Sequence, residues 1–179
     1  MPMQKTPPDG SAQRADCRVV VMGVSGCGKS TLGKQLALAL GMRFVEGDSL
    51  HPPRNVARMA EGTPLTDADR VDWLAAVAAL LAGSTRTVVS CSALKRSYRD
   101  RLRAAASNLC FVHLHGERAE LERRMAQRSG HYMPASLLQS QLDTLEPPGA
   151  DESAVTLDIA QPPDVLVAQA RHFLETSRP

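Results

Sequence analysis

Aromatic residues are scarce in this chain, which argues against one large class of binding proteins. Phe, Trp and Tyr together make up 3% of the 179 residues. That is too few for the stacking surfaces with which proteins bind single-stranded nucleic acid. The charge balance is equally mild, because 21 basic residues face 19 acidic ones and leave a net charge of +2. We therefore expect no nucleic-acid partner.

Long apolar runs and paired cysteines are also missing. No stretch approaches the roughly 18 apolar residues of a membrane span, and the first residues lack the apolar core of a secretion signal. The cysteines Cys17, Cys27, Cys91 and Cys110 form no C-x-x-C pair and have no histidine at zinc-ligand spacing. These absences predict a cytoplasmic protein with reduced thiols and no membrane contact.

Apolar runs alternate with helical patterns along most of the chain. Residues 1–15 are rich in Pro, Gly and polar side chains, and we expect them to be disordered. The predicted strands cover residues 17–23, 43–48, 85–93, 109–116 and 154–160. The predicted helices cover residues 29–41, 52–62, 67–83, 96–106, 117–128, 134–146 and 163–176. This alternation predicts a single α/β domain, residues 16–179, with a parallel five-stranded sheet between two layers of helices.

The turn between the first predicted strand and the first predicted helix has the pattern of a phosphate-binding loop. It reads GVSGCGKS at 23–30 and matches G-x-x-x-x-G-K-[ST] in full. Glycines let successive backbone N–H groups point at phosphate oxygens, the lysine adds charge, and the serine hydroxyl can ligate Mg²⁺. We therefore predict a site for ATP and Mg²⁺. Its nucleotide-binding residues are Gly23, Val24, Ser25, Gly26, Cys27, Gly28, Lys29, Ser30 and Thr31.

The rest of the chain narrows the class of nucleotide-binding protein. It has no N-K-x-D segment for guanine recognition, and the third predicted strand lacks the acidic end of a motor ATPase. Ligands of such sheets bind at the carboxyl ends of the strands, where Asp48 follows the second strand. Its carboxylate could accept the proton of an acceptor hydroxyl or help to hold Mg²⁺. The pattern favours a small-acceptor kinase with the three-layer P-loop NTPase fold of nucleoside-monophosphate kinases.

Several blocks of the chain are more distinctive than the loop. They read GDSLHPPRN at 47–55, MAEGTPLTD at 59–67, CSALK at 91–95 and RSGHYM at 128–133. These blocks resemble the small P-loop gluconokinase family of the thermoresistant type. The departures are small. Cys27 stands where Ser or Thr is usual, Ser90 where Ala is usual, and Tyr132 where Phe is usual. The resemblance implies ATP-dependent phosphorylation of D-gluconate to 6-phospho-D-gluconate.

The resemblance also assigns roles around the acceptor. By similarity Asp48 activates the accepting hydroxyl, while His51, Arg54 and Lys95 hold the carboxylate and hydroxyls of the sugar acid. Gln141 is either a substrate contact or a packing residue. Ser30 and Asp48 are the predicted Mg²⁺ ligands.

A helical lid is predicted at about residues 117–147. Arg124 and Arg128 are four residues apart, so they project from one face of a helix, and Gly130 and His131 follow as a hinge. Such a lid could bring both guanidinium groups over the transferring phosphate. With Lys29 and Asp48, these two arginines complete the predicted catalytic set.

Other interpretations remain open. Trp73 and the apolar stripe of residues 67–82 belong either to the core or to the face of a homodimer. The rival functions are a P-loop kinase for another acceptor, such as shikimate, and an ATP-binding sensor without turnover. The HPPRN and CSALK blocks disfavour the first rival. The presence of Lys29, Ser30 and Asp48 disfavours the second.

Overall fold

The structure, a computed structural model, describes residues 16–127 and 135–177. Strands and helices alternate along these residues, as predicted. The strands are β1 (Cys17–Met22), β2 (Arg43–Glu46), β3 (Arg86–Ser90), β4 (Leu109–His115) and β5 (Ala154–Asp158). The helices are α1 (Lys29–Leu40), the 3-10 helix η2 (Gly47–Leu50), α2 (Pro53–Ala60), α3 (Asp67–Ala82), α4 (Arg96–Ala105), α5 (Arg118–Ala126), α6 (Ala135–Thr144) and α7 (Pro163–Thr176).

The strands form one parallel sheet in the order β2-β3-β1-β4-β5, which confirms the predicted five-stranded parallel sheet. β1 lies at the centre, with Val19 beside Val88 of β3 and Val20 beside Phe111 of β4. The chain leaves β1 toward one side of the sheet and later returns to build the other side. A crevice at the carboxyl end of β1 is therefore the expected ligand position in this fold.

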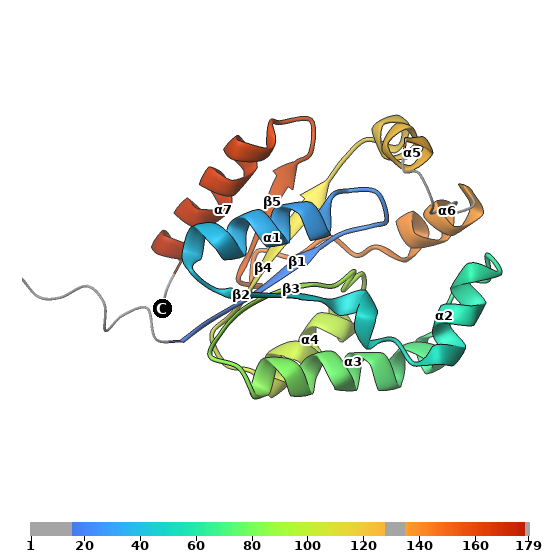
Figure 1. Ribbon diagram of the computed structural model, residues 1–179, viewed down its shortest axis with the longest axis horizontal. Coiled ribbons are helices and arrows are strands. Elements are labelled where there is room, and N and C mark those ends of the chain that lie inside the picture. The colour runs from blue at the N-terminus through green and yellow to red at the C-terminus, as the bar shows by residue number, and fades with distance from the viewer. Residues whose placement is uncertain (1–15, 128–134, 178–179) are drawn as a thin grey trace, which may run out of the picture.

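Helices cover both faces of the sheet (Figure 1). α1 and α7 lie on one face, and α3 and α4 lie on the other. The side chains of β1 alternate between two apolar clusters, Val19 and Val21 in one and Val20 and Met22 in the other. All four are 0% exposed. Burial on both faces explains why the sequence of β1 is apolar without alternation.

The apolar stripe of α3 faces the sheet. Four of its residues are at most 1% exposed: Trp73, Leu74, Val77 and Leu81. They share one cluster with residues of β1, β3 and α4, which confirms the core interpretation. Val71 is the large hydrophobic side chain of this helix that stays exposed, at 41%.

The predicted second strand ends two residues early, at Glu46, because Gly47 begins η2. Gly47 lies so close to β3 that a Cβ atom there would be 2.0 Å from the carbonyl oxygen of Ser90. Only glycine fits this approach. The turn points the next residue, Asp48, past the end of the sheet and into the cleft described below.

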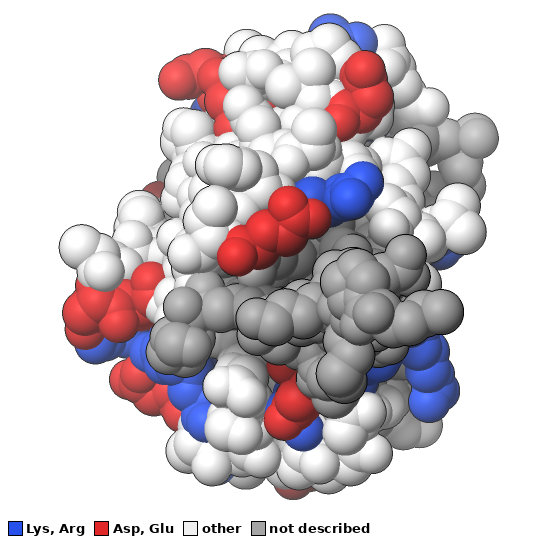
Figure 2. Space-filling model, turned by 90° about the vertical axis from the view of Figure 1, so that its left-hand side faces the viewer, with Lys and Arg blue, Asp and Glu red and all other residues white. Residues whose placement is uncertain are grey.

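Figures 1 and 2 show what lies at the two ends of the domain. The side that carries the end of α7 shows acidic and basic side chains intermingled among uncharged ones (Figure 2). α2, α5 and α6 gather at the opposite end, beyond the carboxyl ends of the strands (Figure 1). In the part of the chain that the structure describes, no helix is long and apolar enough to cross a membrane.

Candidate active site

The phosphate-binding loop connects β1 to α1 and depends on its glycines. Gly26 and Gly28 have φ angles of 82° and 95°. Residues with a Cβ atom rarely adopt such positive angles. A Cβ atom on Gly26 would also lie 2.7 Å from Cγ of Met125 in α5. Lys29 opens α1 and donates from Nζ to the carbonyl oxygen of Val24 at 3.0 Å. The loop is thus a curled backbone that ends in a helix N-terminus, the geometry of an anion cradle.

The side chains available to a metal fit the way kinases hold Mg²⁺. Among residues 16–127 and 135–177, no three His, Cys, Asp or Glu side chains come together as a metal site. Mg²⁺ in such enzymes keeps several waters and takes one or two protein ligands together with phosphate oxygens. Ser30, half-buried in the first turn of α1, and the exposed Asp48 side chain have the oxygen atoms that this ion prefers. The residues present therefore fit ATP with Mg²⁺.

A cleft opens beside this loop and encloses about 640 Å³ of empty space, its open mouth included. Its polar lining consists of Ser25, Lys29, Asp48, His51, Thr63, Arg70, Ser92, Ser140 and Gln141. Apolar side chains, including Met59, Leu65, Trp73, Leu94 and Leu137, complete it. The cleft thus brings the loop lysine together with Asp48 and His51, which come from the end of β2.

His51 lies in a tightly fixed position within the cleft. Its side chain is 4% exposed, and its Nε2 atom lies 4.0 Å from Oδ1 of Asp48. The ring stacks on Trp73, with centroids 4.3 Å apart and an interplanar angle of 13°. Burial lowers the pKa of His51, and the Asp48 carboxylate opposes that effect. The net shift favours the uncharged form of the ring.

Arg54 and Lys95, predicted to hold the sugar acid, are engaged elsewhere. Arg54 forms an exposed ion pair with Asp72, and Lys95 donates to both carboxylate oxygens of Asp67 at 2.9 and 2.8 Å. The Lys95 hydrogen bond lowers the pKa of Asp67. Neither cation is part of the cleft lining described above.

Among the described arginines, Arg70 lines the cleft. It projects from the first turn of α3 and donates from Nη1 to the carbonyl oxygen of Leu65 at 2.5 Å. Arg70 is not among the residues predicted above to hold the acceptor. The signal that could have found it is its position three residues after the distinctive block at 59–67, at the start of the predicted helix 67–83.

Gln141 of α6 contacts the phosphate-binding loop itself. Its Oε1 accepts from the backbone N–H of Ser25 at 2.7 Å, and its Nε2 donates to Oγ of Ser25 at 3.0 Å. These contacts are compatible with both predicted roles, and the substrate contact stays a prediction. Gln141 lines the cleft and also ties α6 to the loop.

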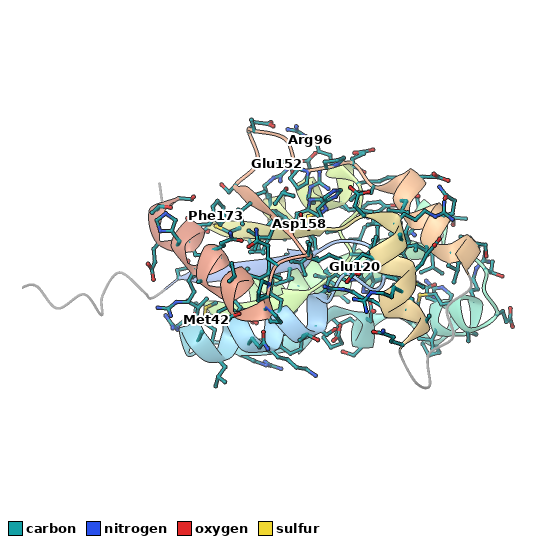
Figure 3. The ribbon with its side chains drawn as sticks, turned by 90° about the horizontal axis from the view of Figure 1, so that it is seen from above. Met42, Arg96, Glu120, Glu152, Asp158 and Phe173 are labelled. Carbon is teal, nitrogen blue, oxygen red and sulfur yellow. The ribbon has the colours of Figure 1, made fainter. Side chains whose placement is uncertain are left out.

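Arg124 of α5 lies over the loop. It donates to Glu120 and, from Nη2, to the carbonyl oxygen of Ile159 at 2.6 Å, and its Nη1 would lie 3.7 Å from a Cβ atom on Gly28. Figure 3 labels Glu120 on α5 and Asp158 at the end of β5. Hydrogen bonds from Arg123 and Arg124 lower the pKa of Glu120 to about 2. Arg128, Gly130 and His131 lie outside the described residues.

The 2-3-1-4-5 parallel sheet, the phosphate-binding loop and the adjoining polar cleft define a P-loop kinase for a small acceptor. A family model described as an AAA domain matches residues 19–148. A gluconokinase of Gluconobacter oxydans (strain 621H) is 50% identical over 160 residues, which cover 87% of this chain and 90% of that protein. The thermoresistant gluconokinase of Escherichia coli (strain K12) is 44% identical over 164 residues, or 89% and 94% of the two chains. The chain belongs to the gluconokinase family.

Solved structures agree with this assignment. A crystal structure of a gluconokinase from Sinorhizobium meliloti 1021 matches with a TM-score of 0.85 and 53% identity, and covers 90% of this chain and 93% of that one. A shikimate kinase from Bacteroides thetaiotaomicron matches with a TM-score of 0.67 at 17% identity, over 89% and 98% of the chains. The second likeness concerns the fold alone.

Proposed function

We propose that this protein catalyses the ATP-dependent phosphorylation of D-gluconate, with 6-phospho-D-gluconate as the product. The observation that carries the proposal is the 50% identity to a named gluconokinase across 87% of the chain. The cleft that Lys29, Asp48 and His51 line together supports it, because phosphoryl transfer needs a donor site and an acceptor site side by side.

The nucleotide end of the site consists of loop residues. Backbone N–H groups of the loop and the Lys29 ammonium offset the charge of the triphosphate. Ser30 and Asp48 are the proposed ligands of Mg²⁺, which neutralises phosphate charge when it is bound. The proposed nucleotide contacts are Gly23, Val24, Ser25, Gly26, Cys27, Gly28, Lys29, Ser30 and Thr31.

At the acceptor end, the Asp48 carboxylate takes the proton of the attacking hydroxyl as general base. The hydroxyl oxygen then forms its bond to the γ-phosphorus while the bond from that phosphorus to the β-phosphate oxygen breaks and ADP leaves. His51 holds a neighbouring oxygen of the sugar acid. Gln141 fixes the loop and borders the acceptor.

The carboxylate of gluconate needs a cation, and three of the described residues are candidates for this role. Arg70 is supported by its place in the cleft lining. Arg54 and Lys95 remain candidates because exposed ion pairs contribute at most about 1 kcal/mol, so a substrate carboxylate can replace Asp72 or Asp67 at little cost.

Arg124 and Arg128 are the proposed lid arginines, which stabilise the negative charge of the transferring phosphoryl group. The position of Arg124 beside Gly28 supports its part. The lid boundaries, the cytoplasmic location and the homodimer stay predictions. Val71 is the exposed large hydrophobic side chain of α3, and a dimer through that helix would bury it.

The test is a coupled assay of ADP release with Mg-ATP and a panel of acceptors: gluconate, shikimate, glucose, AMP and none. We expect release with gluconate alone. ADP release with another acceptor would overturn the assignment of gluconate as the substrate. ATP binding without ADP release would favour an ATP-binding sensor. A Lys29→Ala variant, expected to be inactive with every acceptor, reports contaminating kinases.

A further inference from the structure

Asn55 is a fully buried polar side chain directly behind the cleft, and the mechanism above gives it no part. It lies in the first turn of α2 and is 0% exposed. Its Nδ2 atom donates to the backbone carbonyl oxygen of Asp69 at 2.8 Å and lies 3.3 Å from Nδ1 of His51. A buried amide with so few partners is unusual enough to need an explanation.

The contact with Asp69 fixes which way the amide points. A backbone carbonyl oxygen only accepts hydrogen bonds, so the Asn55 atom facing it must be the nitrogen. The opposite orientation would set two oxygen atoms against each other at that distance. Oδ1 of Asn55 has no hydrogen-bond partner among the residues that the structure describes, so it does not compete for the orientation.

The amide nitrogen carries two hydrogens, and the second one determines the state of His51. With one hydrogen on Asp69, the other is directed at Nδ1 of His51, which must then accept and be unprotonated. In a neutral imidazole the single proton is consequently on Nε2. That atom is the one 4.0 Å from Asp48.

The surroundings hold the ring on one face. The imidazole stacks on Trp73 of α3, whose own Nε1 donates to the carbonyl oxygen of Gly47 at 2.9 Å. Asp69, which holds the Asn55 amide, forms a capping box with Thr66 at the start of the same helix. Asn55 of α2 and Trp73 of α3 thus contact His51 from two sides of the ring system, the edge and the face.

We propose that Asn55 is a positioning residue that keeps His51 in the Nε2–H tautomer, so that His51 offers one hydrogen-bond donor to an oxygen of the sugar acid beside Asp48. A donor there takes a lone pair of the substrate and leaves the proton of the attacking hydroxyl free to pass to Asp48. The role given to His51 toward the sugar acid rests on the proposed gluconokinase activity. Its central observable, the tautomer, can be measured without any substrate.

The direct test is a two-bond ¹H–¹⁵N correlation spectrum of the ¹⁵N-labelled protein at neutral pH. The chain has 5 histidines, and the signals of His51 are those lost in a His51→Gln variant. We expect Nδ1 of His51 to resonate as an unprotonated nitrogen and Nε2 as an N–H. In Asn55→Ala the two signals should move toward each other as the tautomers mix. A proton on Nδ1 in the wild type, or an unchanged pattern in Asn55→Ala, would overturn the proposal.

Kinetics separate positioning from simple packing. Asn55→Ala should raise KM for gluconate about tenfold, the effect of one lost hydrogen bond in a buried site, with KM for ATP unchanged. Equal effects on both substrates would show a structural role only and would contradict the inference. The matched control is Val56→Ala, the next residue of α2 and 50% exposed, which should match the wild type.

A pair of His51 variants covers the case in which Asn55→Ala does not fold. Gln carries its amide nitrogen near the place of Nε2, whereas Asn carries it near Nδ1. We therefore expect His51→Gln to keep a lower KM for gluconate than His51→Asn, and the reverse order would overturn the proposal. If the wild type does not phosphorylate gluconate at all, the proposed function fails, while the spectrum still decides the tautomer.

Discussion

Arg70, Arg54 and Lys95 lie near the acceptor end and differ in what they contact. We expect this difference to show in the KM for gluconate of their variants. Arg70 lines the cleft, whereas Arg54 and Lys95 are paired with Asp72 and Asp67. We expect Arg70→Gln to raise KM for gluconate by about 10- to 100-fold, because a hydrogen bond to a charged group contributes roughly 1.5–3 kcal/mol.

Arg54→Gln and Lys95→Gln should have smaller effects, since each of these cations must first leave its carboxylate. Steady-state rates at saturating ATP give the comparison, and Arg70→Lys serves as the charge-preserving control. A larger effect from Arg54 than from Arg70 would contradict the account of the cleft.

Arg124 and Arg123 are neighbours that share one carboxylate, which makes them a matched pair. Both donate to Glu120, but Arg124 also lies beside Gly28 of the phosphate-binding loop. Arg124→Ala should lower kcat by about 10³-fold, at the low end for an arginine that stabilises a transferring phosphoryl group. Arg123→Ala should leave kcat close to the wild-type value. Turnover at the wild-type rate in Arg124→Ala would end the assignment.

The sequence predicted where the phosphate-binding loop lies, between β1 and α1, but not the contacts around it. The loop could be predicted because its residues are contiguous and each glycine has a local reason. Arg54 and Lys95 were expected, by similarity, to hold the sugar acid. Their partners Asp72 and Asp67 come from α3, 18 and 28 positions away in the chain, and no local pattern indicates such pairs.

At the scale of elements, a buried ion cluster fastens α4 to the turn before β5. Arg99 is 0% exposed and donates to both carboxylate oxygens of Glu152, at 2.7 and 2.9 Å. Arg103 adds a third contact at 2.6 Å, and Arg99 also donates to the carbonyl oxygen of Ala93 at 3.0 Å. Figure 3 labels Glu152 close to Arg96, the first residue of α4. The cluster therefore supports the CSALK segment that borders the cleft.

Removing the acid from this cluster should destabilise the fold. Glu152→Gln leaves the Arg99 charge buried without its counter-ion, and breaking a buried pair in this way costs about 3–5 kcal/mol. Urea unfolding followed by circular dichroism measures the loss. The control is Asp151→Asn, which breaks the exposed pair with Arg96 and should leave the urea midpoint close to that of the wild type. Equal effects of the two variants would contradict the role of the cluster.

The same carboxylate should shape the response to acid. Hydrogen bonds from Arg99, and then Arg103, lower the pKa of Glu152 from 4.5 to about 2. Because the folded pKa lies below the unfolded one, this contribution is present in full above pH 4.5 and is lost as the pH falls toward 2. Stability of Glu152→Gln should therefore depend less on pH across that window than stability of the wild type. Parallel curves would contradict the pKa assignment.

At the scale of the whole molecule, the alternation of apolar strands and amphipathic helices was enough to predict a parallel sheet with helices on both faces. The cleft was harder, because its lining comes from the phosphate-binding loop, η2, α3 and α6, which meet only after folding. His51, for instance, could be predicted from its block, but its stacking on Trp73 could not. Packing between distant segments supplies what the local pattern lacks.

The central claim is that Asp48 and the phosphate-binding loop together phosphorylate gluconate. The most direct measurement is the rate of ADP formation, with and without gluconate, by the wild type and by Asp48→Asn. We predict gluconate-dependent ADP formation in the wild type and a loss of about 10²- to 10⁴-fold in the variant, the usual contribution of a general base. Rates that do not respond to gluconate, or an Asp48→Asn variant as fast as the wild type, would contradict the account.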